Sequence, residues 1–278
     1  MSPRVQRHAT GGRGTHLKEQ FAAIGKEVIG GEVAARLLSV AALLVAWEFG
    51  SALADSRALP SPAAVASFVA GEARSGELGR NVGATLIRVA ASFALAMVLG
   101  TVLGIMLGRS RAANRVFDTW LGLLLNTPAL VVTVLCYVWL GLTETAAIVA
   151  VAVNKLPNVA VIVREGARSI DPQLEEMRAA FRFDRVTWAR HVLLPQLQPY
   201  MIAAARSGLS LAWKIVLVAE LLGRPNGVGY AISYYFQLFD IAALFGYSLV
   251  FTAVMLALDL VVLRPIETHA ARWRTVPA

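Results

Sequence analysis

Charged residues are scarce in this chain of 278 residues, of which 16% are charged and 57% hydrophobic. Soluble domains usually carry about 25% charged residues, so the deficit argues against a soluble protein and favours one whose solvent is lipid. Basic residues outnumber acidic ones by 26 to 18, and such an excess indicates affinity for nucleic acid or for anionic lipid. The distribution of the basic residues, described below, favours lipid and excludes a nucleic-acid partner.

Cysteine is almost absent, because Cys136 is the only one. An intrachain disulfide and a cysteine-based zinc site are therefore excluded, and the apolar run around Cys136 predicts a small buried side chain. The chain also has no phosphate-binding loop, since Gly25-Lys26 lacks the upstream glycine and the following Ser or Thr. Histidine, Asp and Glu form no cluster, so neither a metal site nor an enzyme active site is predicted.

Long apolar runs are what the sequence does contain. Each is close to the ~20 residues that cross ~30 Å of hydrocarbon as a helix. The predicted spans are residues 37–54, 89–107, 120–140, 146–163, 201–222 and 241–263. The third and fourth are joined by only five residues, so they form a helical hairpin. In the second, Gly100, Gly104 and Gly108 repeat every four residues and predict close helix packing.

Lys and Arg give the topology. Outside the spans they gather in residues 1–36, 109–118, 164–200 and 264–278. Basic segments next to spans stay in the cytoplasm, so both termini are predicted there. We therefore expect cytoplasmic tails at residues 1–36 and 265–278, on either side of a transmembrane domain at residues 37–264. The fold class is all-α integral membrane, with about six transmembrane helices.

The cytoplasmic loop at about 164–200 is polar but patterned for two short helices. Asp171 can cap the first helix, and Pro172 suits its first position. Asp184 can cap a second helix that runs to about residue 193, and Pro195 is predicted to end it. Aromatic residues exposed on such a hairpin bind either lipid headgroups or a partner protein, and the pattern alone does not decide between them.

Residues of this loop resemble the EAA loop of ATP-binding-cassette importer permeases. They are Glu176-Met177-Arg178-Ala179-Ala180-Phe181-Arg182, then Trp188, then Leu193-Leu194-Pro195. Other pieces are similar to the nitrate/sulfonate/taurine-type branch of that family: Trp47-Glu48, Leu59-Pro60-Ser61-Pro62, Gly100, Gly104, Gly108-Arg109-Ser110, Trp139-Leu140-Gly141, Glu144, Ala212-Trp213, Ala219-Glu220-Leu221-Leu222-Gly223 and Gly227-Val228-Gly229-Tyr230. The resemblance covers roughly residues 37–275.

The resemblance implies a type I importer permease fold with a coupling helix-turn-helix at about residues 171–195. It implies a transport subunit, not an enzyme, that holds no cofactor itself because a partner ATPase binds ATP and Mg. The implied partners are a second permease chain (an identical copy), a cytoplasmic ATPase dimer, an extracytoplasmic solute-binding protein and a small anionic solute. The implied location is the inner membrane of a bacterium. The residues implied in ATPase coupling are Glu176, Ala179, Ala180, Phe181, Arg182, Trp188, Leu194 and Pro195.

Two residues depart from the family pattern. The family's turn glycine is replaced by Arg182, which costs about 1 kcal/mol if the turn is left-handed; otherwise the turn is built differently. Lys155, in the fourth span, is a charge that the resemblance does not lead us to expect.

A path through lipid needs polar groups, and the fifth span contains Arg206, Lys214 and Glu220. Charges at such depth usually face a bundle interior or a water-filled cavity, so these three are the predicted translocation residues. Alternatives stay open: Arg206 can extend to the interface, Lys214 can pair with Glu220 or Asp259, and Glu220 can lie near the outer mouth. A stand-alone secondary transporter or channel is the alternative function, although the inverted repeats of many such proteins are not evident.

Overall fold

The computed structural model describes residues 34–35, 37–54, 58–263 and 265. The tails predicted at residues 1–36 and 265–278 fall almost wholly outside these ranges. Within them the chain is helical and contains no strand. It divides into two compact units, residues 1–64 and 65–278.

The first unit contains one apolar helix, Leu37–Ala54, as predicted. After it the chain turns at a proline-containing segment, and the Trp47 indole Nε1 donates a hydrogen bond of 3.0 Å to the Pro60 carbonyl. The Leu59 side chain lies beside Gly50 of the same helix. The tryptophan and the proline of the family-like sequence therefore have a local purpose, because together they fix the return of the chain along its own helix.

Most predicted spans are confirmed as long apolar helices. Besides Leu37–Ala54 they are α3 (Glu77–Arg109), α6 (Glu144–Arg168), a helix at Val186–Gly223 and one at Ile241–Val261. The helix at Val186–Gly223 includes α9 (Leu194–Gly223), and the last includes α11 (Ile241–Leu258) and the π-helical turn η2 (Asp259–Leu263). At 33 residues, α3 is about 50 Å long. Because hydrocarbon is only ~30 Å thick, α3 extends beyond it.

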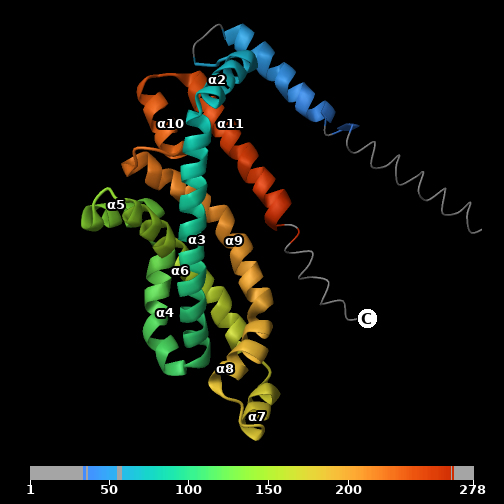
Figure 1. Ribbon diagram of the computed structural model, residues 1–278, viewed down its shortest axis with the longest axis vertical. Helices are drawn as coiled ribbons and strands as arrows, with labels where there is room; N and C mark the ends of the chain where they lie inside the picture. The colour runs from blue at the N-terminus through green and yellow to red at the C-terminus, as the bar shows by residue number, and fades with distance from the viewer. Residues whose placement is uncertain (1–33, 36, 55–57, 264, 266–278) are drawn as a thin grey trace, which may run out of the picture. The chain divides into compact units, whose positions relative to one another are not determined.

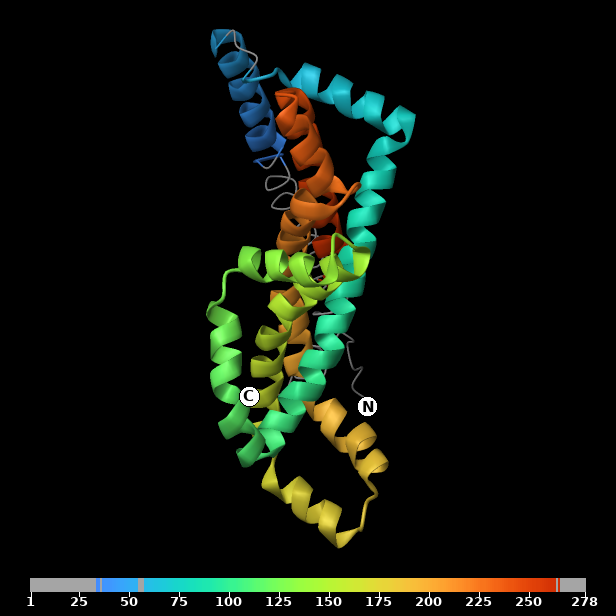
Figure 2. The same ribbon diagram turned by 90° about the vertical axis from the view of Figure 1, so that its left-hand side faces the viewer.

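The third span, predicted at 120–140, corresponds to two helices rather than one. The structure has α4 (Arg111–Asn126) and α5 (Ala129–Leu140), bent by 101° at the break between them. In Figure 2, α4 and α5 are the green helices, and α5 crosses the direction of α4. The described residues therefore contain five helices long and apolar enough to span, or six if the bent pair is one span.

Pro128 causes the break. The residue before a proline avoids the helical region, and Thr127 is accordingly extended (φ −76°, ψ 127°). The carbonyls left open at the end of α4 are satisfied by side chains: Asn126 Nδ2 donates to Gly122 O at 2.8 Å, and Thr127 Oγ1 donates to Leu123 O at 2.8 Å. The end of α4 is thus capped by side chains, whereas the start of α5 has no side-chain cap.

In the second unit, α3 and α6 pack lengthwise and α9 packs against both (Figure 1). The three-glycine repeat of α3, which predicted close helix packing, faces α6. A Cβ on Gly100 would lie 2.7 Å from Val159 Cβ, and one on Gly108 would lie 2.5 Å from Ala167 Cβ. Only glycine permits this approach, so the two helices form a tightly packed pair.

At one end of this unit, α2 (Pro62–Ser75) and α10 (Val228–Gln237) lie beside the start of α11. Phe68 packs edge-on against Tyr235 at 5.2 Å between ring centroids and also approaches Tyr247. These aromatic contacts hold α2 against α10 and α11. We call this end the network end, because the polar network described below lies there.

The opposite end, the hairpin end, carries α7 (Pro172–Ala180) and α8 (Arg185–Trp188), shown in yellow in Figure 2. The prediction that Pro195 ends the second helix is wrong. The helix continues through a π-helical turn, η1 (Ala189–Leu193), directly into α9. Proline lacks the amide that an α-helical bond needs, and the wider π turn immediately before Pro195 shifts the hydrogen-bond register. Pro195 therefore occupies the first turn of α9.

Candidate functional site

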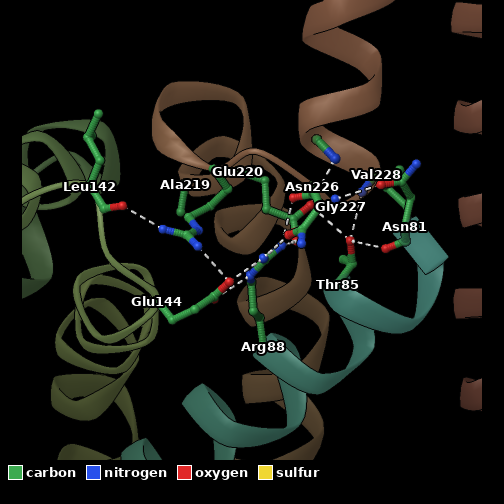
Figure 3. A network of polar contacts seen from close by, with 12 residues as sticks. Asn81, Thr85, Arg88, Leu142, Glu144, Ala219, Glu220, Asn226, Gly227 and Val228 are labelled. Atoms are coloured by element: carbon green, nitrogen blue, oxygen red, sulfur yellow. Dashed lines mark hydrogen bonds and ion pairs between the residues drawn. The ribbon is translucent and has the colours of Figure 1, made fainter.

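A buried ion-pair network lies at the network end, with Arg88 of α3 at its centre (Figure 3). The Arg88 side chain is 4% exposed. Its Nη1 donates to Glu220 Oε1 at 2.6 Å, while its Nε and Nη2 donate to the two carboxylate oxygens of Glu144 at 2.8 and 2.6 Å. The same guanidinium also donates to Asn226. One arginine therefore links α3, α6, α9 and the segment after α9.

Glu220 has no exposed surface and accepts three hydrogen bonds. Besides Arg88, its donors are Thr85 Oγ1 and the Gly229 backbone amide, both at 2.9 Å. Gly227 has φ 111°, and a Cβ there would lie 2.4 Å from the Glu220 carboxyl carbon. Glycine is thus required twice over, for its positive φ and for the space that the carboxylate occupies.

The network extends to α2 and α11 through Asn81. Asn81 Oδ1 accepts from the Gly227 amide at 2.9 Å, and its Nδ2 donates to the Tyr247 hydroxyl at 3.1 Å. Glu72 then accepts from Tyr247 at 2.6 Å and from Tyr235 at 3.2 Å. Burial, together with the Glu72 carboxylate, raises the pKa of Tyr235 to about 12, so this phenol stays a donor at neutral pH.

Arg224 closes the network on its exposed side. It donates to Glu144 Oε1 at 2.7 Å and to the Leu142 carbonyl at 2.6 Å (Figure 3). The loop between α5 and α6 is thereby held against the end of α9. The described residues contain no group of His, Cys, Asp and Glu that could hold a metal ion. Through Arg88 and Arg224, the network locks the start of α6 and the end of α9 to α3.

The hairpin end shows the predicted caps. Asp171 accepts from the Gln173 amide at 2.9 Å, and Asp184 accepts from the Val186 and Thr187 amides at 3.0 and 3.2 Å. Hydrogen bonds from Thr187 hold the pKa of Asp184 below its ordinary value. The two short helices therefore begin where the sequence indicated.

The turn between them is left-handed at Arg182, with φ 52°. The Phe183 amide donates to the Arg178 carbonyl at 3.2 Å. This hydrogen bond typically ends a helix when the residue after its C-cap is left-handed, as Arg182 is here. The family's glycine position thus keeps its conformation here with an arginine in it, at a cost of about 1 kcal/mol.

The predicted coupling residues divide into exposed and buried ones. Exposed are Glu176, Ala180, Phe181, Arg182, Leu194 and Pro195. Phe181, at 69% exposure, stacks on Phe183 with 6.0 Å between centroids. Trp188 is 4% exposed, with Arg109 and Arg178 over its ring. Ala179 lies in α7.

The predicted translocation residues also divide into exposed and buried ones. Arg206 and Lys214 are both exposed and, eight residues apart, lie on one face of α9, whereas Glu220 is buried in the network. A pocket of about 610 Å³ opens between α9 and α11. Its lining includes Arg206, Ser207, Ser210, Trp213, Thr252 and Asp259.

Lys155 is 1% exposed in α6. Its Nζ donates to Asn158 Oδ1 at 2.9 Å, and Ser207 Oγ donates to the same oxygen at 3.2 Å. Gly208 of α9 leaves room for the lysine, because a Cβ there would lie 2.7 Å from Lys155 Cε. Among the described residues, no carboxylate forms an ion pair with this amine.

Sequence reasoning found both hairpin caps but missed Arg88, Thr85, Asn81 and Arg109. Arg88 carried a usable signal, since it is a cation at the edge of an apolar run while Glu144 and Glu220 stand at the edges of two others. Buried charges are normally paired, so these three could have been matched. Thr85 and Asn81 carried no comparable signal.

Comparisons with known proteins agree on one family. Residues 100–274 match the family model described as binding-protein-dependent transport system inner membrane component. A permease of Bacillus subtilis assigned to aliphatic sulfonate transport, SsuC, is 29% identical over 86% of this chain and 87% of its own length. SsuC of Escherichia coli is 31% identical over 68% and 72%. The nitrate import permease NrtB of a Synechocystis strain is 26% identical over 70% and 74%.

Solved structures show the same fold. The inward-facing MetNI methionine ABC transporter is similar with a TM-score of 0.55 and 23% identity, over 70% of this chain and 98% of that one. An amino acid ABC transporter is similar with a TM-score of 0.57 and 17% identity, over 74% and 98%. These likenesses identify the helical fold as that of ABC transporter permeases.

Proposed function

The chain belongs to the family of binding-protein-dependent transport system inner membrane components, and on that premise we propose that it imports a small anionic solute of the sulfonate or nitrate type. It is a multi-pass membrane protein and the permease subunit of an ABC importer. The comparisons give no support to a stand-alone transporter or channel.

The observation that carries the proposal is the pair of cations on one exposed face of α9. Arg206 and Lys214 lie in a helix whose composition is otherwise apolar enough to span a membrane. Such charges are costly against lipid and normally face protein or a water-filled cavity. A positive face attracts anions, and the relatives named above transport sulfonates and nitrate, which are anions.

The pocket between α9 and α11 supplies the rest of the site. Arg206 provides positive charge, Ser207 and Ser210 provide hydroxyl donors, and Trp213 provides an apolar wall. This combination suits a solute that has an anionic group and a small apolar part. Glu220 remains a predicted pathway residue, but within this chain its carboxylate faces only the ion-pair network.

The cationic face also requires a partner. We propose that a second, identical permease chain faces it and that the solute passes between the two copies. At the hairpin end, the exposed Glu176 and Phe181 are proposed to contact a separate ATPase that binds ATP and Mg, and this chain is not itself an enzyme. The hairpin and both termini are placed in the cytoplasm by the Lys and Arg distribution. An external binding protein delivers the solute.

The first experiment isolates the tagged chain from native membranes in mild detergent and identifies its companions by mass spectrometry. We expect an ATPase chain with a phosphate-binding loop. The complex is then reconstituted in vesicles with its binding protein, and uptake of taurine, an alkane sulfonate and nitrate is compared with uptake of a neutral amino acid. Uptake without any ATPase chain would overturn the importer proposal.

Two charge substitutions test the named residues. Glu176→Lys should leave the protein inserted but separate ATP hydrolysis from uptake, while Glu77→Lys, at a partly exposed carboxylate at the network end, should not. Lys214→Ala should reduce anion uptake while ATPase association survives, and Arg115→Ala, an exposed cation of α4, serves as its control. Equal uptake by Lys214→Ala and wild type would assign Lys214 to structure.

A further inference from the structure

We propose that Trp188 is a positioning residue that fastens the coupling hairpin to the end of α3, so that motion of the hairpin is carried along α3 to the ion-pair network around Arg88. This inference rests on the proposed coupling to an ATPase. It gives Trp188 a different task from the neighbouring exposed residues, because its contacts lie inside this chain.

Three separate elements meet at the indole ring. Trp188 belongs to α8, and the guanidinium carbons of Arg109, at the end of α3, and Arg178, in α7, lie 4.6 and 5.1 Å from its ring centroid. Guanidinium groups at such distances are attracted by the π face of an indole. One ring therefore joins both helices of the hairpin to the last residue of α3.

The remaining contacts of Trp188 are apolar and internal. It packs in a buried cluster that includes Val163 and Ala167 of α6 and Leu197 of α9. Its Nε1 is buried and has no hydrogen-bond partner among the described residues, so packing and the two guanidinium groups hold the ring. Its 4% exposure contrasts with 69% for Phe181 and 72% for Val186, which present the apolar surface available to a partner.

Helix α3 can transmit a displacement because it is continuous and braced. It runs without a break from Glu77 to Arg109, and Arg88 lies about 32 Å from Arg109 along it at 1.5 Å per residue. A Cβ on Gly104 would lie 2.7 Å from the Ala160 carbonyl oxygen, so α3 rests directly on the backbone of α6. A tilt imposed at Arg109 therefore moves the pair rather than bending α3.

At the network end, a displacement of α3 acts on hydrogen-bonded side chains, not on lipid. Arg88 is hydrogen-bonded to Glu220 at the end of α9 and to Glu144 at the start of α6. Moving α3 relative to α9 must either lengthen these hydrogen bonds or move the bonded side chains together with Arg88. The hairpin end and the network end are consequently mechanically connected through two arginines of the same helix.

The test compares Trp188→Leu, Trp188→Phe and Phe181→Ala in the reconstituted permease–ATPase complex. We expect Trp188→Leu to keep the ATPase bound but to lower solute imported per ATP hydrolysed at least fivefold. Trp188→Phe, which keeps a π face, should stay within about twofold of wild type. Phe181→Ala should instead weaken ATPase association. A Trp188→Leu complex that loses its ATPase as Phe181→Ala does would make Trp188 a docking residue and overturn the proposal.

A distant reporter separates transmission from simple damage. Gly83, on α3 near Arg88, has open space around it, so Gly83→Cys in a Cys136→Ser background can carry a spin label. We expect an ATP-dependent change in the label's spectrum, and its loss in Trp188→Leu. Arg178→Gln, a milder change for use if Trp188→Leu fails to fold, should weaken the response. An undiminished response in either variant refutes the inference, whereas a wild-type complex without an ATPase refutes the proposed function.

Discussion

Removing the charge of Glu220 should strongly destabilise the protein. In Glu220→Gln, the amide keeps one accepting oxygen but turns a donor toward either Arg88 or the pair formed by Thr85 and Gly229. Breaking a buried ion pair from one side costs about 3–5 kcal/mol. Arg88 keeps Glu144 as a second partner, so we expect the lower part of that range, about 3 kcal/mol.

A surface pair gives the comparison. Glu77 and Arg80 form an ion pair in which the side chains are 44% and 64% exposed, and such pairs contribute about 0–1 kcal/mol. Glu77→Gln should therefore cost at most a third of what Glu220→Gln costs. Arg88→Met combined with Glu220→Gln should be less destabilising than the sum of the two single changes, because the second removes a group already without its partner.

Cys136 supplies the assay. It is the only cysteine of the chain and is 7% exposed, so a thiol-reactive fluorescent maleimide labels it as the helices separate on heating in mild detergent. We expect a labelling midpoint several degrees lower for Glu220→Gln and nearly unchanged for Glu77→Gln. Equal midpoints for these two variants would refute the view that the network locks the helix ends.

Three further predictions concern other parts of the bundle. Gly104→Val should cost about 1–3 kcal/mol through overpacking against α6, whereas Gly83→Ala, in open space, should stabilise by about 0.5–1 kcal/mol, both measured by Cys136 labelling. Lys155→Met should be neutral or stabilising by about 1–3 kcal/mol because it removes a buried charge without an ionic partner; a drop in anion uptake with unchanged stability would instead give the amine a transport role. The cap formed by Asp184 should be fully effective above the ordinary aspartate pKa and lost as pH falls through its lowered folded-state pKa. Loss of the cap should be measured as faster amide hydrogen exchange in α8. Asp184→Asn should remove this pH dependence.

The spans were easy to predict, because a helix that crosses the hydrocarbon must have an apolar run of sufficient length. Caps were equally visible: Asp171-Pro172 and Asp184 act on amides two or three residues away, so the whole interaction lies within a short window of sequence. The glycine repeat of α3 also predicted close helix packing, although not that α6 is the partner.

The helix boundaries that the sequence failed to predict lie at two prolines, Pro128 and Pro195. The apolar run continues across Pro128, so hydrophobicity gave no sign of the 101° bend, which depends on the backbone restriction of Thr127 and on side-chain caps. At Pro195 the opposite happened, because a π turn absorbed the missing amide and the helix continued. Whether a proline breaks a helix is decided by how neighbouring carbonyls are satisfied, and composition does not reveal that.

The ion-pair network could not be predicted from the sequence, for a geometric reason. Arg88 is 56 residues from Glu144 and 132 from Glu220, and which helix ends meet depends on how the helices pack. The burial of Trp188 is similar, since its partners Arg109 and Arg178 lie on two other helices. The motif included Trp188 among the predicted coupling residues but could not indicate which side of the hairpin it faces.

The long separation between Arg88 and its buried partner has a consequence for biogenesis. Chains are synthesised at roughly 5–20 residues per second, so Arg88 is made about 7–26 s before Glu220, because 132 residues separate the two. During that interval the guanidinium must stay near the headgroups, which its place eleven residues into α3 permits. The last pairing can form only after α9 has inserted, so an insertion defect in α9 would leave Arg88 paired with Glu144 but without Glu220, a mark of an unfinished permease.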